Sequence, residues 1–121
     1  MEAVLDANFI ISCMKRKIDF IDALESAGFK IAVPREVIQE LKDLKNNVRH
    51  DDRVAIDTAF SLLEGEKVKK IKLGQGRVDE RLIGLGRRGA YIATLDSAIK
   101  RAVPNRIIIN NAKNAIFVER S

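Results

Sequence analysis

Short apolar runs alternate along the whole chain with longer segments whose apolar residues recur at helical spacing. The short runs predict strands at Ala3–Leu5, Phe29–Val33, Lys67–Leu73, Ala90–Thr94, Arg106–Ile109 and Ala115–Val118. The longer segments predict helices at Asn8–Arg16, Asp19–Ala27, Pro34–Lys45, Asp51–Leu63, Val78–Arg88 and Ser97–Val103. Pro34 suits the first position of its helix, where a missing N–H costs nothing. This alternation predicts an α/β fold with a mainly parallel sheet and helices on both faces.

Two of the predicted strands are followed by an acid. Asp6 follows the first strand, and Asp96 follows the strand that ends at Thr94. In open α/β sheets, ligands bind beyond the carboxyl ends of the strands, near the point where the strand order reverses. If the two strands are neighbours, the two carboxylates repel each other unless one is protonated or a cation lies between them.

Two helices each carry a further acid near the apolar face. Glu40 borders the stripe formed by Val37 and Leu41, although an acid at such an edge can also extend into water. Asp79 lies on the apolar arc of the helix that begins at Val78, where a carboxylate is costly to bury unless it is paired or bound to a metal. Asp79 could instead be a first-turn residue that accepts hydrogen bonds from nearby amides. Glu36 is a substitute or auxiliary acid if the helix is rotated.

Together these positions give four carboxylates directed toward the core or its edge, with no matching set of inward Lys or Arg. A divalent cation would balance that charge. Sites rich in oxygen ligands favour Mg²⁺ or Mn²⁺, which also engage phosphate oxygens. Such a cation can orient and deprotonate a water for in-line attack on a phosphodiester.

Length, charge and cysteine content narrow the class of protein. With 121 residues, the chain predicts a single domain over residues 1–121. One cysteine, Cys13, excludes an internal disulfide and favours a reducing, cytoplasmic compartment, with Cys13 packed in the core. The single histidine, His50, is expected to be a solvated loop residue. Because the first residues lead straight into a predicted strand and no apolar run approaches membrane-spanning length, we expect neither a leader nor a membrane span, and the net charge of +5 is compatible with a polyanionic partner such as nucleic acid.

The ordered motifs resemble the PIN-domain ribonuclease family over almost the whole chain. Asp6-Ala7-Asn8 is similar to the family's opening element, and the segment from Pro34 to Leu41 is similar to the family's helix that carries the second acid. Asp79 is similar to the third acidic position, and Thr94-Leu95-Asp96 is similar to the Thr-x-Asp element that supplies the fourth acid. The resemblance implies a Rossmann-like three-layer αβα fold and Mg²⁺- or Mn²⁺-dependent endonucleolysis of RNA. It also implies an acidic cluster of Asp6, Glu40, Asp79 and Asp96.

The same resemblance gives Asn8 and Thr94 a role in orienting ligands or water around the cluster. Each has an alternative, because Asn8 could be a helix cap or first-turn residue and Thr94 an ordinary strand residue.

The cations expected to contact RNA are Arg77, Lys100 and Arg101, which adjoin the predicted acids in the sequence. Few aromatic residues accompany them, so base stacking is expected to be limited. The Gly74-Gln75-Gly76 loop lacks the Gly-Lys-Ser/Thr ending of a phosphate-binding loop and is expected to be a flexible turn.

Three functions remain open from the sequence. The first is a metal-dependent endoribonuclease, acting in RNA processing or as the toxin of a toxin–antitoxin pair, with an antitoxin, a processing-complex protein or a second copy of the chain as a protein partner. The second is a catalytically inactive PIN-like module that binds RNA or protein. The third is a receiver-type phosphoryl-transfer domain, which would need a lysine at the end of a late strand, where this chain has Asn110.

Overall fold

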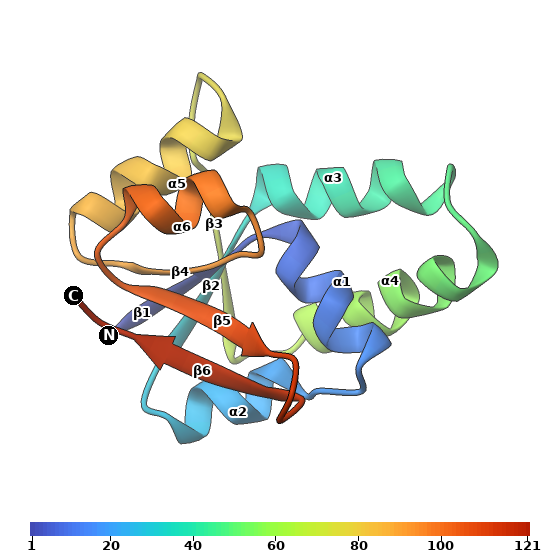
Figure 1. Cartoon of the computed structure of the whole chain (residues 1–121). Helices are drawn as coiled ribbons and strands as arrows, with labels where there is room; N and C mark the ends of the chain where they lie inside the picture. Colours follow the sequence, from blue (N-terminus) through green and yellow to red (C-terminus); the bar gives the residue numbers. More distant parts are fainter.

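The computed structural model describes residues 1–121, and its chain alternates between strands and helices (Figure 1). The strands are β1 (Glu2–Leu5), β2 (Lys30–Pro34), β3 (Val68–Ile71), β4 (Tyr91–Ala93), β5 (Arg106–Asn110) and β6 (Ala115–Glu119). The helices are α1 (Ala7–Lys15), α2 (Phe20–Ser26), α3 (Arg35–Lys45), α4 (His50–Leu63), α5 (Val78–Arg87) and α6 (Ser97–Ala102). All twelve predicted elements are therefore present, with ends that differ by at most two residues.

The six strands form one sheet in the order β3-β2-β1-β4-β5-β6. The first five strands are parallel, and β6 pairs with β5 in the antiparallel direction. Strand β1 lies between β2 and β4, and its Ala3, Val4 and Leu5 are completely buried, as expected for a central parallel strand. The order reverses between β1 and β4, which places the strands that precede Asp6 and Asp96 side by side.

Helices cover both faces of this sheet, which makes three layers. On one face, α1 to α4 pack over Leu5 and its neighbours in a cluster of 20 buried residues. On the other face, α5 and α6 pack over Val4 and Ile92 in a cluster of six. Figure 1 shows α5 and α6 above the sheet and α2 below it. Because side chains alternate along β1, Leu5 packs in the larger cluster and Val4 in the smaller one. The predicted three-layer αβα fold is confirmed.

Two local predictions were wrong. Pro34 is the last residue of β2 and caps α3, with an extended backbone at ψ 139°, rather than being the first helical residue. His50 is the exposed first residue of α4 rather than a loop residue. Its helix begins one residue earlier than the apolar pattern indicates, and the acidic residues Asp51 and Asp52 in its first turn suit the helix dipole.

Two residues show how closely the layers pack. Cys13 is buried within the larger cluster, and burial raises the pKa of its thiol to about 12, so its predicted packing role is confirmed. Gly86 of α5 lies so close to its neighbours that an added Cβ would come within 2.5 Å of the Val103 Cγ1. A larger residue there would push α5 away from the segment after α6. None of the helices is long and apolar enough to cross a bilayer.

Candidate active site

A hollow of about 640 Å³ opens at the edge of the sheet where β1 and β4 end. Its walls come from the start of α1, from α3, from the loop before α5 and from the starts of α5 and α6. All four acids singled out from the sequence line it, together with Asn8 and Arg77. The fold therefore brings together side chains that are up to 90 residues apart, from Asp6 to Asp96.

Asp6 is the most buried of the four acids, with 8% of its surface exposed. It directly follows β1 and caps α1, and its Oδ1 accepts a hydrogen bond of 2.9 Å from the N–H of Ala7. Its Oδ2 accepts one of 2.8 Å from the hydroxyl of Thr94. Burial raises the pKa of the Asp6 carboxyl, and the negative charges of Asp96 and Asp79 raise it further, while the two hydrogen bonds act in the opposite direction.

Thr94 and Asn8 hold the chain around Asp6. Thr94 is completely buried just after β4, and its oxygen also accepts a hydrogen bond of 3.1 Å from the N–H of Asp96. Asn8 reaches across from α1, and its Oδ1 accepts a hydrogen bond of 3.0 Å from the N–H of Leu95. The two side chains tie the segment after β4 to the segment after β1. Thr94 was expected at the end of the strand, but it lies one residue beyond it and makes polar rather than strand contacts.

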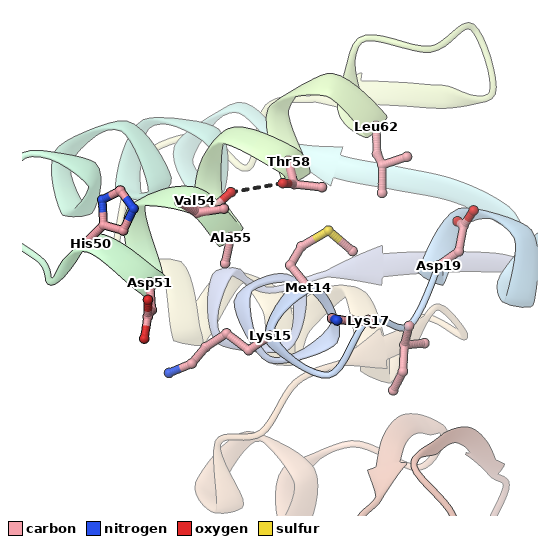
Figure 2. A pocket seen from close by; sticks show the side chains of 11 residues that line it. Met14, Lys15, Lys17, Asp19, His50, Asp51, Val54, Ala55, Thr58 and Leu62 are labelled. Atoms are coloured by element: carbon pink, nitrogen blue, oxygen red, sulfur yellow. Dashed lines mark hydrogen bonds between the residues drawn. The ribbon is translucent and has the colours of Figure 1, made fainter.

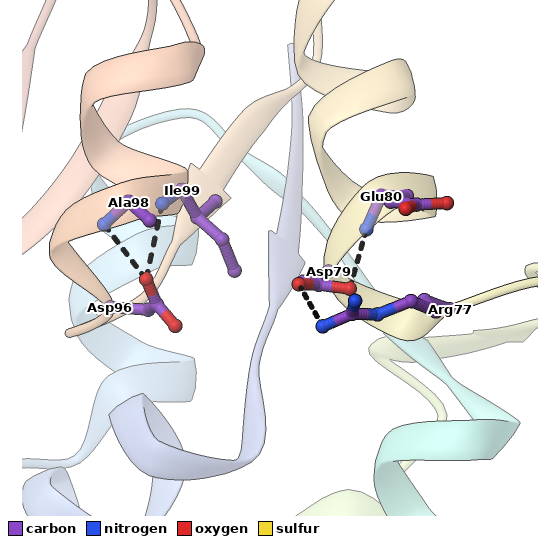
Figure 3. A network of polar contacts seen from close by, with 6 residues as sticks. All are labelled: Arg77, Asp79, Glu80, Asp96, Ala98 and Ile99. Atoms are coloured by element: carbon purple, nitrogen blue, oxygen red, sulfur yellow. Dashed lines mark hydrogen bonds and ion pairs between the residues drawn. The ribbon is translucent and has the colours of Figure 1, made fainter.

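Asp96 and Asp79 occupy matching places at the N-terminal ends of two helices (Figure 3). Asp96 caps α6, and its Oδ1 accepts hydrogen bonds of 2.8 Å and 3.2 Å from the N–H groups of Ala98 and Ile99. Asp79 lies in the first turn of α5, and its Oδ1 accepts one of 2.9 Å from the N–H of Glu80. Asp79 is thus a first-turn residue that accepts a hydrogen bond from a nearby amide, as the alternative interpretation of the sequence held, and it also lines the hollow.

Glu40 approaches the hollow from α3, at the edge of the apolar stripe as predicted. Partial burial raises the pKa of its carboxyl, and the charge of Asp6 adds to that effect. Glu36, four residues earlier, was held open as an auxiliary acid, and that hypothesis was wrong. Its carboxylate accepts hydrogen bonds of 3.1 Å and 3.2 Å from the N–H groups of Leu73 and Gly74, and these bonds lower its pKa. Glu36 therefore fixes the loop after β3 instead of lining the hollow.

The four carboxylates do not converge on one point. No group of three or more His, Cys, Asp and Glu side chains is arranged to hold a metal ion in this structure. The hydrogen bonds explain the separation, because Asp96 turns toward the amides of α6 and the Asp79 Oδ2 toward the Arg77 Nη2 at 3.3 Å. The donors nevertheless suit Mg²⁺ or Mn²⁺ in kind, because all are carboxylate oxygens around one hollow and their mutual repulsion is part of what raises the pKa of Asp6.

The three cations expected to contact RNA lie in two places. Arg77 lines the acidic hollow, and its exposed guanidinium pairs with Asp79. Lys100 and Arg101 do not reach that hollow, because they lie further along α6 and line a separate one beside β5. A third hollow, between α1 and α4, is bordered by His50 and lies away from the four acids (Figure 2).

Comparison with known proteins settles the family. A family model described as a PIN-like domain matches residues 3–110. This chain belongs to the PIN-like domain family. The expected resemblance is confirmed, and the match extends from β1 to the end of β5. The comparison with solved structures agrees with it. The PIN domain of the endonuclease Utp24 aligns over 99% of this chain and 92% of its own, with 20% identity and a TM-score of 0.76.

Two further relatives complete the comparison. The PIN domain of human SMG5 aligns over 93% of this PIN-like domain and 95% of its own chain, with 15% identity and a TM-score of 0.52. A protein named glutamyl-tRNA reductase, from Caldivirga maquilingensis, is 33% identical over 114 residues. That match covers 83% of this chain and 28% of the relative, so this chain spans less than a third of the curated protein's length.

Proposed function

We propose that this PIN-like domain is an endoribonuclease that depends on Mg²⁺ or Mn²⁺. The observation that carries the proposal is the hollow at the junction of β1 and β4, which four carboxylates line and in which Asp6 is buried beside the charges of Asp79 and Asp96. Burying one carboxylate beside others costs free energy unless a cation offsets the repulsion, so the arrangement favours a function over a structural role.

Asp6, Glu40, Asp79 and Asp96 are the residues that would hold the cation. When bound, Mg²⁺ or Mn²⁺ supplies the activation of a water for in-line attack on the phosphorus and stabilises the leaving oxygen. Arg77 is exposed and pairs with Asp79 through one guanidinium nitrogen, so its remaining N–H groups are available to a phosphate of the RNA.

The surrounding side chains orient these groups. Thr94 donates a hydrogen bond to Asp6 and accepts one from the backbone of Asp96, so one hydroxyl sets the spacing between the first and fourth acids. Asn8 restrains the same segment through Leu95. Glu40 reaches the same hollow from α3, where partial burial and the charge of Asp6 raise the pKa of its carboxyl.

The alternative of a catalytically inactive binding module is less favoured. A module that only binds RNA, a polyanion, has no use for four carboxylates around one hollow, because they repel phosphate. The same cleavage chemistry would serve an RNA-processing enzyme and the toxin of a toxin–antitoxin pair, and the proposal includes both.

Cleavage of a mixed pool of labelled single-stranded and hairpin RNAs tests the proposal. The purified protein is incubated with Mg²⁺, Mn²⁺ or EDTA, beside the variants Asp96→Asn and Asp57→Asn. Asp57 is an exposed acid of α4 that pairs with Lys45, so its variant is a matched control. We expect cutting that requires the metal, is lost in Asp96→Asn and is retained in Asp57→Asn. Equal cutting by both variants, or cutting in EDTA, would contradict the proposal.

A further inference from the structure

A second hollow, of about 330 Å³, lies on the other side of α6 from the acids. It is lined by Ser97, Lys100, Arg101, Arg106, Ile108 and Glu119. The two hollows lie on either side of the start of α6, because Asp96 lines the acidic hollow and the next residue, Ser97, lines this one. A chain-like ligand that occupied both would cross the N-terminal end of α6.

The second hollow has an excess of positive charge. Arg106 is held in place by an ion pair of 2.7 Å with Glu119 and by a hydrogen bond to the carbonyl oxygen of Lys100. Lys100 and Arg101 belong to none of the ion pairs in the structure. Arg101 is exposed and Lys100 is half-buried, so this hollow carries two cations without an ion-pair partner, and they favour an anionic ligand.

An aromatic ring completes this surface. Phe117 of β6 lies opposite Ile108 of β5, and because side chains alternate along strands, it shares the face of Ile108 and Arg106. The side chain is 38% exposed on the edge strand, and it is the one exposed aromatic residue of the chain. Few aromatic residues accompany the candidate cations along the chain, and base stacking was therefore expected to be limited.

We infer that Lys100, Arg101 and Phe117 form a binding surface, the α6 flank, for an unpaired segment of RNA next to the cleaved phosphodiester. The inference deepens the proposed function and rests on it. Cations follow the phosphates of a single strand while an exposed ring stacks on a base. Bases within a duplex are already stacked and turned inward, so they cannot reach Phe117. The α6 flank thus selects single-stranded sequence beside the cut.

The competing occupant of this face is a second copy of the chain, paired through the open edge of β6. Charge argues against it. In a symmetric pair that buried this face, the unpaired cations Lys100 and Arg101 of one copy would meet the same cations of the other, and like charges at an interface weaken association. An RNA strand offers the opposite charge and the bases that a ring can stack on.

Fluorescence anisotropy in EDTA tests the α6 flank without cleavage. The probes are a fluorescein-labelled 12-nucleotide oligoadenylate, an abasic strand with the same phosphates, and a 12-base-pair RNA duplex. We expect Phe117→Ala to weaken binding of the oligoadenylate about tenfold and to leave the abasic strand and the duplex unchanged. Phe117→Leu should behave like Phe117→Ala, because it keeps apolar volume but removes the ring. Phe117→Trp keeps an aromatic ring and should bind like the wild type.

The cations have a different expected signature. Lys100→Ala and Arg101→Ala should weaken binding of both the oligoadenylate and the abasic strand, and each should reduce the slope of log affinity against log salt by about 0.7. Two exposed residues on other surfaces provide controls, Lys30→Ala at the start of β2 and Val54→Ala on α4, which should bind like the wild type. Thermal midpoints of all variants establish that each is folded.

Unchanged oligoadenylate affinity in Phe117→Ala would overturn the inference. So would a wild-type dimer that Phe117→Ala converts to monomer with no change in affinity, as measured by light scattering, because it would assign the face to a second copy. Loss of binding in Phe117→Ala together with a wild type that cuts no RNA would sustain the α6 flank and refute the nuclease. Metal-dependent cutting with binding unaffected by Phe117→Ala would do the reverse.

Discussion

Thr94→Val is expected to destabilise the protein, because one hydroxyl serves two of the acids. Thr94 is completely buried, donates to the Asp6 Oδ2 at 2.8 Å and accepts from the N–H of Asp96 at 3.1 Å. Valine has nearly the same shape, so the substitution removes the two hydrogen bonds without opening a cavity. The lost bond to a carboxylate costs about 1.5–3 kcal/mol, and the N–H left without an acceptor costs about 1–3 kcal/mol. Burial of the added methyl returns about 0.8 kcal/mol.

The free energy of unfolding should fall by about 2 kcal/mol in total, because water at the exposed end of the loop can replace part of the hydrogen bond that the N–H of Asp96 loses. For a chain of this length, a change of 1 kcal/mol shifts the thermal midpoint by about 4 °C, so the expected drop is about 8 °C at neutral pH. The hydrogen bond from Thr94 lowers the pKa of Asp6, so the valine variant has a higher Asp6 pKa than the wild type. The penalty should therefore be smaller in acid, where Asp6 is protonated in both proteins, and should grow as the pH rises.

Scanning fluorimetry in EDTA between pH 4 and pH 8 measures both the size and the pH dependence of the penalty. The control is Thr58→Val, because Thr58 lies exposed on α4 and its hydroxyl donates to the carbonyl oxygen of Val54 at 2.9 Å. That variant should stay within about 0.5 kcal/mol of the wild type at every pH. A penalty for Thr94→Val that equals that of Thr58→Val, or that does not change with pH, would refute the role assigned to the hydroxyl.

Three further variants test the folded state. Asp6→Asn should leave the thermal midpoint in EDTA unchanged or raised at neutral pH, with any gain disappearing as the pH falls through the raised Asp6 pKa, and a marked drop at neutral pH would argue against carboxylate repulsion. Glu36→Gln should lower the free energy of unfolding by about 1 kcal/mol at neutral pH, and by less as the pH falls through the lowered Glu36 pKa. It should also speed amide exchange at Gly74, and unchanged exchange would exclude the hydrogen bond from Gly74 to Glu36 as a restraint on the loop after β3. Gly86→Ala should cost about 1–3 kcal/mol in denaturant melts, whereas Gly84→Ala, with no atom within 4 Å of the added Cβ, should be neutral or stabilising; equal effects would exclude close packing of α5.

The order of elements could be predicted from the sequence because apolar periodicity is a local property. Val4 and Leu5 mark a strand with two buried faces, whereas its position beside β4 was left open by the sequence and is a finding of the structure. The convergence of Asp6 and Asp96 on one hollow was predictable for the same reason, since the carboxyl ends of parallel strands lie at one edge.

Side-chain partnerships could not be predicted in the same way. Glu36 and Glu40 are one helical turn apart and look alike in the sequence, but Glu36 meets the free N–H groups of Leu73 and Gly74 while Glu40 meets the hollow. That difference depends on where the loop after β3 returns to the sheet. The neighbourhood of Phe117 depends likewise on the antiparallel pairing of β6 with β5, which brings it opposite Ile108.

The central claim is that the hollow lined by the four carboxylates binds a divalent cation, and calorimetric titration with Mn²⁺ tests it most directly. The wild type is titrated at pH 7.5 beside Asp6→Asn and beside Asp51→Asn, which alters an exposed acid of α4 outside the acidic hollow. We predict saturable Mn²⁺ binding by the wild type and by Asp51→Asn, and its loss in Asp6→Asn. Equal binding by all three proteins, or no binding by the wild type, would contradict the account.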